Sequence, residues 1–268
     1  MVPSFINVFR ALVKSERFVF GTGHVDAKDI NQYKCINVMI CKELKIPTTI
    51  TSDLAYLCGV FAGDGSINIR KEKYEYSLKC VGNPADEKEF YLQIIKPIFK
   101  RVFCHALEIR SFDKDTTFGF RVFSKKLVTY LIEVIGLPCG RKYDSLDIPA
   151  VFFRDEILLL NFIRGVFDTD GCICFKRKYR AVPYYPVISL SSRSPVFIKS
   201  ISSVLKGLGL KVFELYDYKL KDVRASGGFT VISRIDLNGQ KNLVLWTKKI
   251  GFLSPKHSNK IKKYWKEK

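Results

Sequence analysis

The chain has 268 residues, 47% of them hydrophobic, which is enough for a packed core in one large domain or two small ones. Its net charge of +19, from 45 basic and 26 acidic side chains, favours a polyanionic partner, nucleic acid before an anionic membrane surface. No apolar run reaches the roughly 18 residues of a membrane span, and the first ten residues lack the layout of a secretory signal, so neither a membrane protein nor a secreted one is expected.

The eight cysteines and three histidines follow no disulfide or zinc pattern. The sequence contains no Cys-x-x-Cys pair, and Cys172 and Cys174 alternate as residues of one strand do. We therefore expect small buried thiols in a reduced, intracellular protein, cytoplasmic in an archaeon or bacterium, or organellar.

Residues 1–50 form an N-terminal extension without a diagnostic motif. Residues 27–44 predict a helix, with Asp26 as its cap and Pro47 just past its end. The extension is expected to pack on the core; the alternative is a small basic appendage that contacts DNA.

Residues 54–65 predict a helix that is buried on most sides and ends at an acidic residue. Nearly all of its positions are apolar up to Asp64. Gly59 and Gly63 lie four apart and so share one helix face. Glycine inside a helix costs about 1 kcal/mol relative to alanine, so this spacing indicates close approach of a second helix.

After this helix the alternation of polar and apolar residues predicts a strand pair, a helix, a second strand pair and another helix. The expected positions are a hairpin over residues 66–80, a helix over 86–103, strands over 106–112 and 118–123, and a helix that begins at Ser124 and ends at Gly136.

The same pattern returns 106 positions later, in residues 160–171. Gly165, Asp170 and Gly171 match Gly59, Asp64 and Gly65. The expected elements are a hairpin over 173–190 with a basic loop, a helix from Ser194 to Gly207, strands over 211–220 and 228–237, and a helix over 239–250. The segment 141–158 joins the halves, which gives a first unit at 51–145 and a second at 146–268.

The two motif helices are expected to pack side by side through their small residues and to deliver Asp64 and Asp170 to the same end. Each carboxylate then faces the negative end of a helix dipole and repels the other. A divalent cation relieves both penalties, because hard cations take oxygen ligands. The alternative is that Asp-Gly simply stops each helix, which is less favoured because two copies occur in register.

These motifs resemble the paired signature of the LAGLIDADG homing endonucleases, in the single-chain, two-motif (dodecapeptide) form. The similarity covers roughly residues 50–265. It implies an α/β (α+β) fold of two pseudo-symmetric αββαββα units, packed through the motif helices, each with a curved antiparallel sheet for DNA. The chain has no starting Cys or Ser and no terminal His-Asn pair, so we expect a free-standing enzyme and not a splicing intein.

The resemblance implies a monomer that cuts both strands of a long asymmetric DNA target, in intron or gene homing, with Mg²⁺ or Mn²⁺ as cofactor. The implied metal ligands are Asp64 and Asp170, with the backbone carbonyls of Gly63 and Thr169. The implied basic residues near the metals are Lys142, with Arg141 as its rival, and Lys256. Asp168 is a further acidic candidate that is expected to point to another face.

Strands that lie over a duplex can present alternate side chains to the major groove, where each base pair has a distinct pattern. Each candidate reader has an alternative as an ordinary solvated side chain, since exposed Lys and Arg are common. The candidates are Asn68, Arg70, Lys73, Tyr76, Arg110 and Arg121 in the first unit, and Lys176, Arg177, Lys178, Arg180, Arg193, Lys219 and Arg224 in the second.

Two other functions remain on the same scaffold: a maturase that binds the RNA of its own intron, and a DNA-binding regulator that does not cut. Both would tolerate the loss of one motif aspartate. The chain keeps Asp64 and Asp170, which favours the nuclease.

Overall fold

The computed structural model describes residues 43–266 apart from 144, 180, 182 and 224–226. Residues 43–268 form one compact unit. Residues 1–42 of the N-terminal extension, and with them all but the last two residues of the helix expected over residues 27–44, lie outside the described part. None of the described helices is long and apolar enough to cross a membrane.

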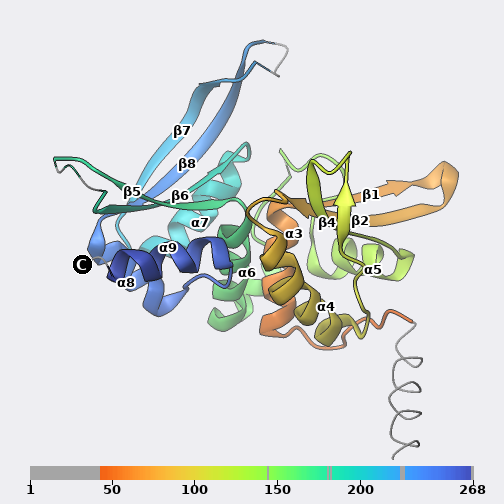
Figure 1. Cartoon of the computed structure of the whole chain (residues 1–268). Helices are drawn as coiled ribbons and strands as arrows, with labels where there is room; N and C mark the ends of the chain where they lie inside the picture. The colour runs from red at the N-terminus through yellow and green to blue at the C-terminus, as the bar shows by residue number, and fades with distance from the viewer. Residues whose placement is uncertain (1–42, 144, 180, 182, 224–226, 267–268) are drawn as a thin grey trace, which may run out of the picture. The chain divides into compact units, whose positions relative to one another are not determined.

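Two buried helices, α3 (Ser52–Gly63) and α6 (Glu156–Thr169), form the centre of residues 43–268 and run side by side (Figure 1). The Thr51 side chain accepts a hydrogen bond from the Leu54 N–H at the start of α3, and Asp155 caps α6 in the same way. The two helices touch at glycine, since a Cβ on Gly59 would lie 3.0 Å from the Gly165 Cα. The predicted close approach of the motif helices is confirmed.

The first unit carries a four-stranded antiparallel sheet with the order β1-β2-β4-β3. Helices cover one face of this sheet, and the other face is open (Figure 1). Its elements are β1 (Gly65–Arg70), η1 (Lys71–Lys73), β2 (Glu75–Gly82), η2 (Phe90–Ile95), α4 (Lys96–Phe103), β3 (Arg110–Phe112), β4 (Thr117–Phe123), α5 (Lys125–Thr129) and η3 (Tyr130–Ile135).

The second unit repeats this arrangement with the order β5-β6-β8-β7. Its elements are η4 (Ala150–Arg154), β5 (Gly171–Lys176), β6 (Tyr185–Ser192), α7 (Pro195–Gly207), β7 (Val212–Lys221), β8 (Phe229–Asn238), α8 (Gln240–Lys249) and α9 (Pro255–Lys266). The predicted fold of two αββαββα units, joined through the motif helices, is therefore confirmed.

Three local features differ from the prediction. Strand β3 is limited to Arg110–Phe112, shorter than the expected 106–112. Helix α9 was not predicted; it buries His257, Ile261 and Tyr264, which are spaced four and three apart as one helix face requires. The β7–β8 hairpin carries a bulge between Leu215 and Tyr218 and extends beyond β5 and β6 (Figure 1).

Strand register decides which side chains face the open side of each sheet. Ile67 pairs with Leu78 and both are buried, whereas the next pair, Asn68 and Ser77, points to the other face. Tyr76 pairs with Ile69 and packs against the buried cluster. We call the face that carries Asn68 the open face of the first sheet.

Candidate functional site

Asp64 and Asp170 end α3 and α6 with nearly the same backbone geometry. Their φ and ψ angles are −79° and −12° at Asp64 and −82° and −13° at Asp170, and each N–H donates to the carbonyl four residues before it, 3.0 Å away. The Asp170 carboxyl carbon lies 3.4 Å from the position of a Cβ on Gly63. The structure thus brings the two predicted aspartates to one place.

Both carboxyl groups are buried and electrostatically strained. Burial raises the pKa of Asp64 to about 8, and the charges of Asp170 and Glu87 add to the rise. The pKa of Asp170 rises to about 6, mainly through burial and with a contribution from Glu87. Lys142 lowers both pKa values, and the Tyr91 hydroxyl, which donates to Asp64 at 3.3 Å, lowers that of Asp64. A bound cation would relieve this strain by replacing the lost hydration of two negative charges.

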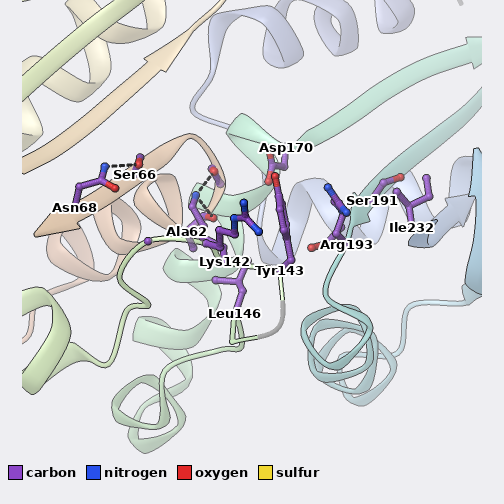
Figure 2. A pocket seen from close by; sticks show the side chains of 14 residues that line it. Ala62, Ser66, Asn68, Lys142, Tyr143, Leu146, Asp170, Ser191, Arg193 and Ile232 are labelled. Atoms are coloured by element: carbon purple, nitrogen blue, oxygen red, sulfur yellow. Dashed lines mark hydrogen bonds between the residues drawn. The ribbon is translucent and has the colours of Figure 1, made fainter. Parts of the chain in front are cut away.

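The predicted basic residue Lys142 is at this site, directly below the end of α3 (Figure 2). Its ammonium donates to the carbonyl oxygens of Phe61, Ala62 and Gly63 at 3.2, 2.9 and 2.5 Å. These carbonyls are left without helical partners at the end of α3, so Lys142 caps the helix and neutralises its negative pole. Its rival Arg141 is exposed.

The second predicted lysine has a different environment. Lys256 donates to Glu87 at 3.0 Å and lies 3.9 Å from Asp86, both on the first unit. Glu87 is buried, and its other carboxyl oxygen accepts the Asn83 N–H at 2.7 Å. Sequence reasoning missed Glu87, because within the expected helix over residues 86–103 it looks like an ordinary surface acid.

Asp168 points away from the aspartate pair, as expected, and holds other parts of the chain. It accepts the Tyr56 hydroxyl at 2.7 Å and the N–H groups of Leu253 and Ser254 at 3.0 and 3.1 Å. Burial raises its pKa to about 6 although these donors oppose the shift. Asp168 therefore fastens the segment that leads into α9, where Lys256 lies.

Two carboxylates suit a cation that takes the rest of its oxygen ligands from water or phosphate. The described residues contain no cluster of three or more His, Cys, Asp or Glu side chains that could enclose a metal ion. Mg²⁺ commonly binds one or two carboxylates and completes its shell with water and phosphate oxygens, so the pair Asp64 and Asp170 fits it. The Thr169 hydroxyl donates back to Gly165 and Val166, which leaves its carbonyl as the predicted ligand.

A pocket of about 590 Å³ adjoins this site and draws its walls from both units. Figure 2 shows Asp170, Lys142, Tyr143 and Arg193 around it. The Arg193 guanidinium stacks 4.0 Å from the Tyr143 ring centroid. The pocket therefore joins a carboxylate to cationic and aromatic groups, a combination that accommodates phosphate and base.

The open face of the first sheet gathers most of the predicted DNA contacts of that unit. Asn68, Arg70, Arg110 and Arg121 share it by strand register, and Lys73 lies in η1 between β1 and β2. Tyr76 was predicted to face the DNA, and this prediction is wrong. Tyr76 pairs with Ile69, and both side chains pack against the core.

Sequence reasoning missed two members of this face. Lys79 and Phe112 join it by register, and the Lys79 ammonium lies 5.2 Å from the Phe112 ring centroid. The Arg110 guanidinium also lies over this ring, 5.1 Å from its centroid. Lys79 stands between Leu78 and Cys80, which are both buried. The alternation within β2 alone could therefore have placed Lys79 on the open face.

In the second sheet the open face carries Cys172, Cys174 and Lys176, and the basic loop after β5 carries Arg177 and Lys178. Lys178 lies 3.4 Å from the Tyr185 ring centroid. Arg180 and Arg224, also predicted as DNA contacts, lie outside the described residues.

The bulge in β7 changes the facing of Lys219. Leu215 pairs with Arg234, but beyond the bulge Tyr218 pairs with Ile232, so one side-chain alternation is lost. Lys219 therefore lies opposite the face that carries Arg234, contrary to its predicted role on the open face. Arg234, which donates to Asp236 at 2.8 Å, takes a place there that the sequence did not indicate.

The chain matches known proteins in sequence and in fold. Residues 158–251 match the family model of the LAGLIDADG-like domain. An uncharacterised protein of Methanocaldococcus jannaschii is 26% identical over 178 residues, which cover 65% of this chain and 61% of that protein. A glutamine–fructose-6-phosphate aminotransferase of the same organism is 24% identical over 225 residues, 84% of this chain but 18% of that protein. The chain thus spans less than two thirds of either relative.

Solved structures of the homing endonuclease I-DmoI share the fold. Its complex with DNA and Ca has a TM-score of 0.54 at 16% identity, covering 79% of this chain and 97% of that one. Its complex with DNA and Mn has a TM-score of 0.51 at 17% identity, covering 75% and 96%. The family match over the second unit and the shared fold confirm the resemblance inferred from the two motifs.

Proposed function

We propose that this chain, which has the fold of the LAGLIDADG homing endonucleases, is a metal-dependent, site-specific DNA endonuclease. It makes a double-strand break at a long asymmetric target and acts in intron or gene homing. The observation that carries the proposal is the pair Asp64 and Asp170, buried side by side at matched helix ends. A fold that needed only two stacked helices would gain nothing from carboxylates in this position.

Divalent ions, held by Asp64, Asp170 and the carbonyls of Gly63 and Thr169, would activate water and stabilise the leaving oxygen of the phosphodiester. Lys142 keeps the end of α3 in place and lowers the pKa values of both aspartates, so that both ionise more readily. Lys256, from the second unit, adds a positive charge that can face the phosphate backbone.

The substrate is double-stranded DNA, which the two sheets read through their open faces. The net charge of +19 supplies the phosphate contacts, and Arg110, Arg121 and Lys176 are placed to reach base edges. Residues 51–145 and 146–268 then each read one half of the target. If the chain contacts 6–10 phosphates, its affinity falls on the order of 10³–10⁵-fold between 50 and 200 mM salt.

A cleavage selection from randomised long duplexes in Mg²⁺ tests this function. We expect one preferred target, both strands cut near its centre, and no cutting in EDTA. Binding to a selected duplex without cutting would reject the nuclease in favour of a DNA-binding regulator. Binding that prefers structured intron RNA would favour the maturase.

A further inference from the structure

The outer strand pairs of the two sheets carry different side chains on their open faces. In the first unit the pair β3–β4 presents Arg110 and Arg121, which lie over the Phe112 ring at 5.1 and 6.0 Å from its centroid. In the second unit the described residues of β7 and β8 place one basic side chain on the open face, Arg234. Its guanidinium is engaged by Asp236 at 2.8 Å. Any contact that β7–β8 makes with a base must therefore rest mainly on other side chains.

The bulge in β7 decides which side chains these are. Leu215, before the bulge, lies on the open face because it pairs with a residue of that face. Regular alternation from Leu215 would place Lys219 and Lys221 there as well. Since the bulge inserts an extra residue, Tyr218 and Leu220 take that side instead, and both lysines turn to the opposite one. The bulge thus exchanges two cations for two large, mainly apolar side chains.

The result is a continuous apolar patch on the open face of β7–β8. By strand register it consists of Phe213, Leu215, Tyr218, Leu220 and Ile232. Its four members on β7 are between 36% and 59% exposed, so the fold does not cover them. Helix α7 lies on the other side of the strand, where its Ser202 hydroxyl donates to Glu214. A group of exposed apolar side chains on one face, unlike a scattered single one, is typical of a binding surface.

The patch is continuous with the proposed cleavage site. Ile232 lines the same pocket as Asp170 and Lys142. A duplex that reaches the aspartate pair and lies along the second sheet therefore meets the patch. The β7–β8 hairpin extends beyond β5 and β6 (Figure 1), and a two-stranded ribbon of this kind fits the major groove. The apolar group that base pairs present in the major groove is the C5-methyl of thymine.

We infer that the apolar patch recognises thymine methyl groups in the half of the target that the second unit binds. The inference rests on the proposed nuclease function and specifies part of its substrate. The first unit reads its half with guanidinium groups, which suit the acceptors of guanine. The second unit reads thymines by contact with the patch, so the two halves of the target differ in the chemistry by which they are recognised.

The experiment measures binding of the whole chain to its selected duplex, with Ca²⁺ in place of Mg²⁺, before and after thymidine is replaced by deoxyuridine. This replacement removes the methyl group and keeps the charge and the base pairing. In the half bound by the second unit we expect affinity to fall about fourfold for each methyl group that the patch covers. In the other half the loss should be about twofold or less. Arg110→Ala assigns the halves, because it should relax base preference only in the half bound by the first unit.

Two neighbouring residues provide a variant and its matched control. Leu220→Gln should weaken binding to the thymidine duplex but not to the deoxyuridine duplex, so that the ratio of the two affinities falls to about twofold or less at the base that Leu220 covers. Lys219→Gln changes the next residue, on the opposite face, and should leave this ratio as in the wild type. Both side chains are exposed, so both variants should fold, and their melting temperatures check this. Tyr218→Ser gives a second, independent test of the patch.

The remaining outcomes separate the inference from the proposed function. A chain that selects no duplex at all would refute the proposed function itself. If a duplex is selected, a second half without preferred thymines would overturn the inference, and so would an equal loss of affinity on deoxyuridine in both halves. A free chain that is a dimer in solution and becomes a monomer in Leu220→Gln, with an unchanged affinity ratio, would assign the patch to contact with a second copy and also overturn it.

Discussion

In the first half of the chain Asp64 ends α3, and in the second Asp170 ends α6 with φ and ψ angles within 3° of the same values. Around these matched ends the halves diverge: Lys142 caps α3 through three carbonyls, whereas Lys256 pairs with a carboxylate of the opposite half. Close packing imposes one geometry on both helix ends. The groups around them lie outside this helix contact and are free to differ.

The matched aspartates should prove equally necessary. Asp64→Asn and Asp170→Asn are each expected to reduce cleavage of both strands at least about 100-fold, because each removes a ligand of the proposed metal site. DNA binding should persist, since each change removes a negative charge. Cleavage assays beside binding assays in Ca²⁺ measure both effects, with Asp53→Asn, at an exposed ion pair with Arg101, as the matched control. Cleavage close to wild type in either variant would rule out the metal assignment.

Replacing either glycine at the contact between α3 and α6 with a larger residue should destabilise the protein to a similar extent. Gly59→Leu and Gly165→Leu must push the helices apart, because a Cβ at either position already meets the backbone of the other helix. We expect a loss of about 1–3 kcal/mol or more of unfolding free energy, with activity falling in parallel. Thermal and denaturant melts measure it.

Gly207→Ala is the control for this pair, since nothing lies within 4 Å of a Cβ at that position near the end of α7. It should be neutral or slightly stabilising, by up to about 1 kcal/mol. Unchanged melting of Gly59→Leu would show that the helices do not pack through this face.

The two lysines should differ in their effect on stability. Lys142→Met leaves three carbonyls at the end of α3 without their donor and removes a positive charge near both aspartates. We expect a cost of about 1–3 kcal/mol in unfolding free energy and slower cutting of both strands. Lys256→Met, by comparison, should leave the cap of α3 intact and deprive the buried Glu87 of its ammonium partner. An unchanged unfolding free energy in Lys142→Met would show that its ammonium does not stabilise the end of α3.

The raised carboxyl pKa values predict a modest pH effect on metal-free protein. The pKa of Asp64 is raised to about 8 in the folded chain, above its value in the unfolded chain, so the folded state holds a proton that the unfolded state has lost. This stabilisation is complete below the unfolded pKa and is lost as the pH rises through about 8. The melting temperature should therefore fall between pH 7 and 9, less so in Asp64→Asn, and Mg²⁺ should reverse the fall at pH 9.

That pH window avoids His257, which acts in the opposite sense. The buried imidazole has a pKa lowered to about 4, mainly by burial, so its effect is confined to more acidic solutions. A melting temperature that is flat from pH 7 to 9 in the wild type would contradict the burial of Asp64.

Much of the frame was predictable from the sequence because its causes are local and repeated. The apolar runs before Asp64 and Asp170, their glycines and the alternating strands each leave a pattern with a short period. Helix α9 was not predicted, although His257, Ile261 and Tyr264 have helical spacing. The lysines between them make the apolar face of this helix hard to recognise in the sequence.

Other features of the site depend on long-range contacts that no short pattern records. The burial of Glu87 depends on an ion pair with a lysine 169 positions away. The facing of Lys219 follows from a bulge whose residue Asp217 adopts a φ of +51°, without a glycine to mark it. Alternation alone placed Lys219 on the wrong side for this reason.

The central claim is that one chain supplies both halves of one cleavage site. The mass of the complex on a selected target, determined in solution together with a footprint of both strands, tests it most directly. We predict one chain per duplex, an asymmetric footprint, and cleavage positions at its centre, because the open faces of the two sheets carry different side chains. Two chains bound to a perfect palindrome would contradict the account.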